Sequence, residues 1–471
     1  MNNSASSFGT ALPIAIETFR IDGAYSQYAA FLSHNQRVVS NSHGIFLTYL
    51  TYYHAEPPES GLYYTTKWRL LHSVTNGMSW RTIGNEWQEQ HTKAPALETD
   101  ELDNLYLVNG KFPSSDASFI RLLASEQYYN PHTTPIFNES TIPDGGADKS
   151  CMLYDRTFKR FYYFHSHSND KQFHVISPDG TVNSTVYLLN NGQPRERTEA
   201  PKPLPPDEHG VPQFKDPLPY GAAHQYPLLA LGEDRTLHMA WTSQVSPGLN
   251  PGPHHDYQYW SIHHLLSTDG GTTWQNLQGG KVNKPIYADD VRADLIIRGD
   301  EFDSHAWLAN MMAKDGKLHF LYTVPDESQN PATYPQLGGV QHYVRYDLRT
   351  GQRDVDIHPM FKGQGVSLYG RNGTGGFFAS RGSQPDAPLY CVTNARDRNL
   401  ACLRSDDNGA SWHDYAVRTD DDNTGDNTDE IDHISGCREL TDDGYIIGCF
   451  SMASSAKRPG FHFFRIPTRS L

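Results

Sequence analysis

The stretch Ser267-Thr268-Asp269-Gly270-Gly271-Thr272-Thr273-Trp274 decides the fold, because its spacing returns elsewhere in the chain. The same order recurs at Ser405, Asp407, Gly409 and Trp412, and a degenerate copy stands at Ser73, Thr75, Gly77 and Trp80. In such a stretch the aspartate caps backbone N–H groups, the glycine supplies a positive φ, and the tryptophan covers the turn from the next strand. The repeat therefore predicts tight turns that each join two antiparallel strands.

Apolar strands alternate with turns around these stretches and divide the chain into repeating units. The expected units are Phe31–Trp80, Leu102–Ile136, Lys149–Leu189, Gln225–Trp274, Trp307–Tyr346, Val366–Trp412 and Ile434–Ile466. They predict an all-β, seven-bladed β-propeller formed by residues 1–471 as a single domain, with six blades as the alternative if the weak second unit is not a blade. The three stretches resemble the Asp-box, or BNR, repeat of sialidase-like β-propellers, which implies turns between the two outer strands of a blade.

Two further segments are placed by this architecture. The last unit lacks a fourth strand, so the N-terminal strand Pro13–Ile21 is expected to complete it and to leave no free sheet edge. The Pro-rich stretch 190–219 is expected to be a loop, either a solvated linker or a cover folded over the site.

Composition and charge narrow the class of protein. Aromatic residues at 12%, with 38 glycines and 30 prolines, favour a turn-rich β protein. No apolar run approaches the roughly 20 residues that span a bilayer. The net charge of -15 argues against nucleic acid and anionic membranes as partners, since both would be repelled over most of the surface. We expect a monomer that is secreted or periplasmic, with a signal peptide absent from this sequence; because Met1–Thr10 is polar, an intracellular protein is the alternative.

Neither the cysteines nor the acidic residues indicate a cofactor. The pairs Cys391 with Cys402 and Cys437 with Cys449 could each face across a hairpin, but buried free thiols are favoured over disulfides there. No Cys/His spacing indicates zinc, so no metal ligands are expected. The acidic run Asp420–Glu430 leaves room for a structural calcium ion, although a solvated loop is favoured because the EF-hand spacing is absent.

Candidate site residues gather on one face of the expected propeller. The start of each innermost strand and the end of each second strand lie beside the central channel, on what we call the channel face; the Asp-box turns lie on the opposite face, the turn face. Aligned strand starts place Asp148, His224, His305 and His433 at equivalent positions on the channel face, with Tyr226 and Trp307 two residues after two of them. Ends of second strands add His165, His167 and Arg381, and nearby loops add Tyr257, Arg292 and Arg371. For any single histidine, a hydrogen-bonded structural role is the alternative.

Histidine, tyrosine and arginine together suit β-elimination at a uronic acid. A cation neutralises the carboxylate and acidifies the C5 proton; a histidine or tyrosine removes that proton, and another donor protonates the leaving oxygen. Histidine suits this role because its ordinary pKa lies close to neutral pH.

At these residues the chain resembles the propeller-fold polysaccharide lyases that cut ulvan or the rhamnose-glucuronate linkage of gum arabic. The matching stretch is Tyr226-Pro227 at the opening of an inner strand, with His224 two residues before it and the blade running on to Trp241. We expect catalytic roles for His224, Tyr226, His165 and His305. We expect binding of a uronate-containing oligo- or polysaccharide by His167, Arg292, Arg371, Arg381, His433, Tyr257, Trp307 and Asp148. Ulvan-type lyases carry an arginine at the end of the second strand, the strand that follows the one opened by Tyr-Pro, and this chain has Thr242 there. Arg292, Arg371 or Arg381 must then neutralise the carboxylate, or the reaction differs.

Two other functions stay open. A sialidase-like exo-glycosidase is the first, because Asp-boxes are abundant in that class, but its Arg-Ile-Pro signature belongs near the start of the chain and Arg465-Ile466-Pro467 stands at the end. The second is a glycan-binding propeller without catalysis.

Overall fold

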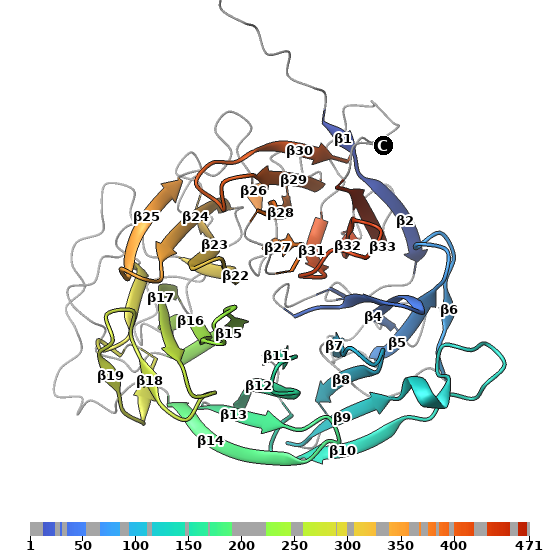
Figure 1. Ribbon diagram of the computed structural model, residues 1–471, viewed down its shortest axis with the longest axis horizontal. Helices are drawn as coiled ribbons and strands as arrows, with labels where there is room; N and C mark the ends of the chain where they lie inside the picture. The colour runs from blue at the N-terminus through green and yellow to red at the C-terminus, as the bar shows by residue number, and fades with distance from the viewer. Residues whose placement is uncertain are drawn as a thin grey trace, which may run out of the picture.

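Seven β-sheets surround a central axis, so the chain is an all-β, seven-bladed β-propeller as predicted (Figure 1). This computed structural model describes residues 13–23, 29–30, 35–52, 66–84, 94–110, 115–146, 150–167, 170–190, 223–245, 258–288, 290–298, 306–325, 339–357, 367–368, 375–382, 386–394, 400–418, 431–452 and 460–468. Within these ranges the helical structure is the 3-10 helix η1 (Ala124–Glu126), and no helix there is long and apolar enough to cross a membrane. The weak second unit forms a blade, which removes the six-bladed alternative.

Each blade is an antiparallel sheet whose strands run outward in chain order, except where noted for the last. The first blade contains β3 (Val38–Asn41), β4 (Gly44–Tyr52), β5 (Thr66–Ser73) and β6 (Arg81–Thr82); the second contains β7 (Ala96–Thr99), β8 (Leu105–Gly110), β9 (Ala117–Leu122) and β10 (Asn138–Ile142). The third contains β11 (Ser150–Asp155), β12 (Arg160–His167), β13 (Asp170–Ile176) and β14 (Val182–Asn190); the fourth contains β15 (Ala223–Leu231), β16 (Leu237–Val245), β17 (Gln258–Ser267), β18 (Trp274–Gln275) and β19 (Lys281–Val282).

The remaining blades follow the same plan. The fifth contains β22 (Trp307–Lys314), β23 (Lys317–Pro325), β24 (Gly339–Asp347) and β25 (Gln352–Ile357); the sixth contains β27 (Phe377–Ser380), β28 (Leu389–Asn394), β29 (Leu400–Ser405) and β30 (His413–Val417). The seventh contains β31 (Ile431–Gly436), β32 (Tyr445–Met452) and β33 (Gly460–Pro467), with the N-terminal strand β2 (Glu17–Asp22) antiparallel to β33 as its outermost strand. Short strands extend the sheets: β1 (Ile14–Ala15) pairs with β30, β20 (Ile286–Tyr287) with β14, β21 (Asp294–Arg298) with β17, and β26 (Ser367–Leu368) with β24.

The start of the sixth unit was predicted wrongly, and the error moves one candidate residue. The stretch 366–368 was assigned to the inner strand of that unit, but β26 pairs with β24 in the fifth blade. The strand β27, which was predicted to be the second strand of the sixth blade, is its innermost strand. The signal was misleading because Gly375 and Gly376 separate a two-residue edge strand from a four-residue inner strand, and neither is long enough to show a period.

The core lies between blades rather than inside a single layer. Seven clusters of buried apolar residues occur in the described part, and each joins two neighbouring blades. Inner strands such as β27 and β28 are therefore buried along their whole length and are mainly apolar, with polar residues at their ends, whereas the outer strand β25 alternates exposed and half-buried residues. All five cysteines are buried and free; Cys391 and Cys402 belong to clusters on opposite sides of the sixth blade.

The three serine turns, residues 73–80, 267–274 and 405–412, share one hydrogen-bond pattern. The serine hydroxyl accepts the N–H of the glycine four residues on, at 2.9, 2.8 and 2.7 Å. The side chain two residues after the serine accepts a hydrogen bond from the backbone N–H of the residue four positions later. This side chain is a carboxylate at Asp269 and Asp407 and a hydroxyl at Thr75. The glycines have φ values of 87°, 94° and 83°. A hydroxyl thus replaces the carboxylate in the degenerate copy without loss of the turn.

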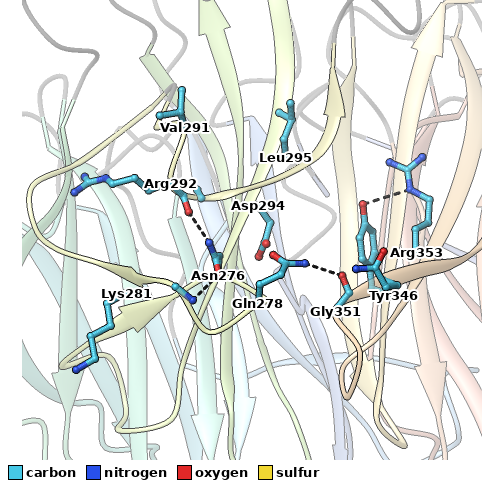
Figure 2. A pocket seen from close by; sticks show the side chains of 13 residues that line it. Asn276, Gln278, Lys281, Val291, Arg292, Asp294, Leu295, Tyr346, Gly351 and Arg353 are labelled. Atoms are coloured by element: carbon cyan, nitrogen blue, oxygen red, sulfur yellow. Dashed lines mark hydrogen bonds between the residues drawn. The ribbon is translucent and has the colours of Figure 1, made fainter.

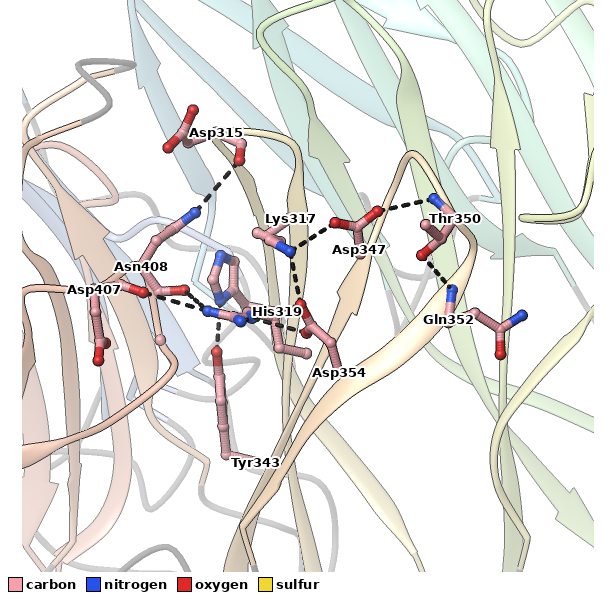
Figure 3. Close-up of polar contacts among 12 residues, drawn as sticks. Asp315, Lys317, His319, Tyr343, Asp347, Thr350, Gln352, Asp354, Asp407 and Asn408 are labelled. Atoms are coloured by element: carbon pink, nitrogen blue, oxygen red, sulfur yellow. Dashed lines mark hydrogen bonds and ion pairs between the residues drawn. The ribbon is translucent and has the colours of Figure 1, made fainter.

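Each serine turn also packs against an aromatic ring of the preceding blade. The tryptophan of the turn meets this ring edge to face: Trp80 with Phe463, Trp274 with Phe173, and Trp412 with Tyr343. A Cβ added to the turn glycine would overlap the same ring in all three places. Around the last turn, Arg345 donates to the carbonyl of Asn408, and the side chain of Asn408 donates to the carbonyls of Lys314 and Asp315 (Figure 3). These turns therefore hold neighbouring blades together.

Residues before the first blade brace the middle of the ring. The side-chain amide of Asn35 donates to the carbonyl of Ser150 and accepts from the N–H of Met152, both in the third blade. The backbone carbonyl of Asn35 accepts a hydrogen bond from the hydroxyl of Ser435 in the seventh blade. Gln36 bonds Glu98, which forms an ion pair with Arg438. This segment therefore ties blades together across the axis.

Candidate functional site

Polar residues form rows at the channel-face end of several blades. In an antiparallel sheet, residues directly opposite one another on neighbouring strands project to the same side. The rows are Ser150, His165 and Gln172 in the third blade; His224, Ser243 and Ser261 in the fourth; Trp307, Thr323 and Gln341 in the fifth; and His433 with Ser451 in the seventh. The predicted column of strand starts is thus one edge of a broader polar band.

Several members of these rows are buried and have no hydrogen-bond partner among the described residues. They are both ring nitrogens of His224, both amide atoms of Gln172 and of Gln341, and the hydroxyls of Ser243, Thr323 and Ser451. Buried polar atoms are bonded in the great majority of cases, so a group of unbonded ones at one level needs an explanation. Their concentration at the channel face favours this face as the functional one.

His224 lies at the inner edge of the polar band, on the innermost strand of the fourth blade. Its side chain is 1% exposed and opposes Ser243, and its ring centroid is 5.9 Å from that of Trp241. His263 lies opposite Trp241 on the neighbouring strand, and the two rings stack. Its Nε2 forms a hydrogen bond with the hydroxyl of Ser261, at 2.8 Å. Burial lowers the pKa of His224 well below its ordinary value, and the charges of Lys171 and His263 lower it further. His224 is therefore a neutral imidazole near pH 7.

Tyr226 is held by an irregular backbone. Its φ of 52° is left-handed, which a bulky residue seldom adopts, and the pairing of β15 with β16 shifts register between Gln225 and Leu228. Pro227 supports this bulge because it has no N–H to donate to the ladder. The ring of Tyr226 packs on that of Trp307, with centroids 4.3 Å apart. The bulge therefore brings together two predicted site residues from adjacent blades.

His165 is placed at the channel-face end of β12, as expected, but its ring is engaged. Its Nε2 lies 2.7 Å from Nε2 of His174, so one imidazole donates and the other accepts, and the rings stack. Burial lowers the pKa of His174 to about 4. Of the other predicted residues on this face, His433 is buried on β31, and His167 ends β12, where its backbone pairs with Asp170.

Arg381 does not lie on the channel face, and its predicted placement is wrong. It directly follows β27, an innermost strand, and innermost strands end at the turn face. Its guanidinium donates to the carbonyl of Asp442, in the turn between β31 and β32. The wrong start of the sixth unit caused this error, because it made a first strand look like a second one.

Arg292 is also away from the channel face, which corrects the second of the predicted cations. It lies between β20 and β21 at the outer rim and forms an ion pair with Asp290. There it lines a cavity of about 690 Å³ between the fourth and fifth blades, together with Asn276, Asp294 and Arg353 (Figure 2). The loop spacing suggested proximity to the axis, but the pairing of β21 with β17 carries this segment to the outer edge of the blade.

Four predicted site residues, Asp148, Tyr257, His305 and Arg371, lie outside the described residues, as do most of the Pro-rich stretch 190–219 and the acidic run 420–430. Within the described ranges, no group of three or more His, Cys, Asp or Glu residues could hold a metal ion.

The sequence reasoning missed Lys171, His263, Gln172 and Gln341. Lys171, Gln172 and Gln341 stand near the starts of third strands, which also reach the channel face, whereas only the starts of first strands and the ends of second strands were aligned. His263 lies in the middle of the third strand β17, opposite Trp241. The available signal was a polar residue at the second or third position of an otherwise apolar strand, as in Asp170-Lys171-Gln172-Phe173.

Buried neutral histidines predict acid sensitivity. Burial lowers the pKa of six described histidines below 6.5: His72, His174, His224, His238, His263 and His319. The unfolded chain binds more protons than the folded one as the pH falls below about 6.5, so the free energy of unfolding should fall by up to about 1.4 kcal/mol per pH unit for each histidine. Urea unfolding from about pH 7.5 down to about pH 5 should show this loss, with a smaller slope in His238→Gln; a flat profile would contradict it.

Comparison with solved structures agrees with the fold. An ulvan lyase of polysaccharide lyase family PL25, solved bound to -[GlcA(1-4)Rha3S]-, matches with a TM-score of 0.61 and 12% identity over 97% of this chain and 98% of that chain. The polysaccharide lyase Uly1 matches with a TM-score of 0.55 and 9% identity over 96% of this chain and 99% of that one. These structural neighbours are propeller polysaccharide lyases. At such identities the likeness shows the shared fold alone.

Propeller hydrolases are similar as well, but more distantly. The GH93 α-L-arabinofuranosidase of Fusarium graminearum matches with a TM-score of 0.41 and 11% identity over 80% of this chain and 92% of that chain. No model of a protein family matches the sequence, and no curated protein does.

Proposed function

We propose that the protein is a polysaccharide lyase that breaks a glycosidic bond to a uronic acid by β-elimination, on the channel face at the start of β15. The observation that carries this proposal is that Tyr226, held by a bulge beside Trp307, and His224, a buried neutral imidazole two residues earlier, both stand at the channel-face start of β15. A phenol and a neutral imidazole are the two kinds of group that such a reaction needs as proton donor and acceptor.

The phenol of Tyr226 and the imidazole of His224 suit the following proton transfers. A base removes the proton at C5, and the electron pair forms the double bond between C4 and C5. The bond from C4 to the glycosidic oxygen breaks, and that oxygen receives a proton. The intermediate carries negative charge next to the carboxylate, so a positive group beside the carboxylate stabilises it. Trp307 offers a ring against which an apolar sugar face can pack.

The proposed substrate is an oligo- or polysaccharide that contains a uronate, such as the rhamnose-glucuronate linkage of gum arabic, or ulvan. The PL25 ulvan lyase with the same fold was solved with such a glucuronate-rhamnose chain, which supports this class. The net charge of -15 would repel a polyanion except where local cations and polar groups meet, so a short or end-bound substrate suits the channel face. A polymer substrate also favours a secreted or periplasmic location, and we propose that the protein acts there as a monomer.

Product absorbance tests the proposal. Elimination creates an unsaturated uronate that absorbs in the far ultraviolet, whereas hydrolysis creates reducing ends without this absorbance. We expect absorbance to rise with at least one member of a panel that includes gum arabic and ulvan. New reducing ends without absorbance would identify a glycoside hydrolase instead, and binding without either product would identify a glycan-binding propeller.

A further inference from the structure

The expected carboxylate-neutralising arginine has no counterpart at the position where the resemblance places it. Thr242 stands there, fully buried, and its hydroxyl accepts the N–H of Leu308 at 3.1 Å. This position therefore joins the fourth and fifth blades. Arg292 and Arg381 lie away from the channel face, so neither can take over the role.

Lys171 occupies the channel-face end of β13, next to the blade that carries His224. It opposes Ser166, the penultimate residue of β12, and its side chain is 3% exposed. Residues two apart on a strand share a side, so Lys171 projects to the same side as Phe173. Phe173 packs with Trp241 in the cluster between the third and fourth blades, and Trp241 contacts His224. The ammonium thus belongs to the interface that holds His224.

The electrostatics agree with this geometry. Lys171 is the cation whose charge lowers the pKa of His224, beyond the larger effect of burial. In a site shielded from water a charge acts more strongly than at the surface, so an ammonium here attracts an anion more than an exposed lysine would. Arg69 is a less suitable cation for this role, because it belongs to the first blade, which does not adjoin the fourth. Its guanidinium also forms an ion pair with Asp22 at 2.9 Å.

We propose that Lys171 binds and neutralises the uronate carboxylate, and so sets the preference for an acidic sugar. This inference rests on the proposed function. The ammonium forms an ion pair with the carboxylate and disperses the charge that develops when the C5 proton leaves. Because the imidazole of His224 is neutral, it does not bind the carboxylate as a second cation. It can therefore accept or donate a proton.

The chain provides a matched control. Lys67 is the second residue of β5, is buried, and opposes the penultimate residue of β4, just as Lys171 is the second residue of β13 and opposes the penultimate residue of β12. It lies in the first blade rather than beside His224. Lys67→Met therefore removes a buried lysine at the equivalent register, away from the proposed carboxylate site.

The test compares calorimetric binding of a glucuronate oligosaccharide with binding of its carboxyl-reduced counterpart. Wild type and Lys67→Met should prefer the acid by about 10-fold or more, Lys171→Met should lose this preference and about 100-fold in turnover, and Lys171→Arg should keep most of both. A preference that survives in Lys171→Met, or that wild type lacks, overturns the inference. If wild type prefers the acid through Lys171 but forms no unsaturated product, Lys171 is the uronate ligand and the lyase proposal fails.

Discussion

Replacement of Tyr226 by phenylalanine should reduce turnover of a uronate-containing substrate by about 100-fold to 10,000-fold, the usual contribution of one acid or base. The change removes only the phenol oxygen. The ring, its packing on Trp307 and the bulge before Leu228 remain, so thermal unfolding should change little. Initial rates of absorbance increase would measure the effect.

The control for this prediction is Tyr163→Phe. Tyr163 donates its hydroxyl to the carbonyl of Gly145 and lies in the cluster between the second and third blades. Its loss should cost stability and leave turnover unchanged. Equal activity in Tyr226→Phe and wild type would remove Tyr226 from the mechanism.

His224→Ala should also abolish turnover while the propeller still folds. Because the side chain is buried, alanine leaves a cavity, so His224→Gln serves as a companion that keeps most of the volume. Both variants lack a basic imidazole and should be inactive. An active His224→Gln enzyme would show that this histidine has only a packing role.

Gly409→Ala should lower the free energy of unfolding by about 2 to 5 kcal/mol. The backbone at Gly409 has a φ of 83°, which costs a residue with a Cβ about 1 to 2 kcal/mol, and the added Cβ would overlap the phenol of Tyr343. Relief of that overlap requires a shift of the ring, which also bonds His319, and overpacking of this kind costs about 1 to 3 kcal/mol more (Figure 3). Urea unfolding at fixed pH would measure the loss.

Gly316→Ala separates the two causes. Gly316 has a φ of 67° in the turn between β22 and β23, but a Cβ added there would meet no atom within 4 Å. It should therefore lose only the conformational part, about 1 to 2 kcal/mol. If both alanine variants lose the same amount, the serine turn does not depend on contact with the preceding blade.

The fold was predictable because its signals are local. The spacing from Ser267 to Trp274 describes hydrogen bonds within eight residues, and the bonds accepted by the serine and by the residue two after it form at each copy. Strand periods and turns set the number of blades, and ring closure then follows from the need to cover sheet edges. The weak points were short strands, β7 and β26, whose four and two residues cannot display a period.

The site was predictable only in part. His224, Tyr226 and Trp307 could be placed because each stands at the start of an innermost strand, and that register follows from the blade pattern. Arg292 and Arg381 were misplaced because their positions depend on which blade β21 and β26 join. That choice is made by pairing between strands distant in sequence.

The sequence by itself determined the repeating turn, the all-β class, the seven units and the tyrosine and histidine at the opening of the fourth blade. Only the tertiary structure decided which cation lies near the histidine. Lys171 comes from the neighbouring blade, 53 positions before His224 in the chain, and meets it through packing of Phe173 against Trp241. Short-range patterns record turns and strand faces, whereas contacts between blades depend on side-chain packing that no local period contains.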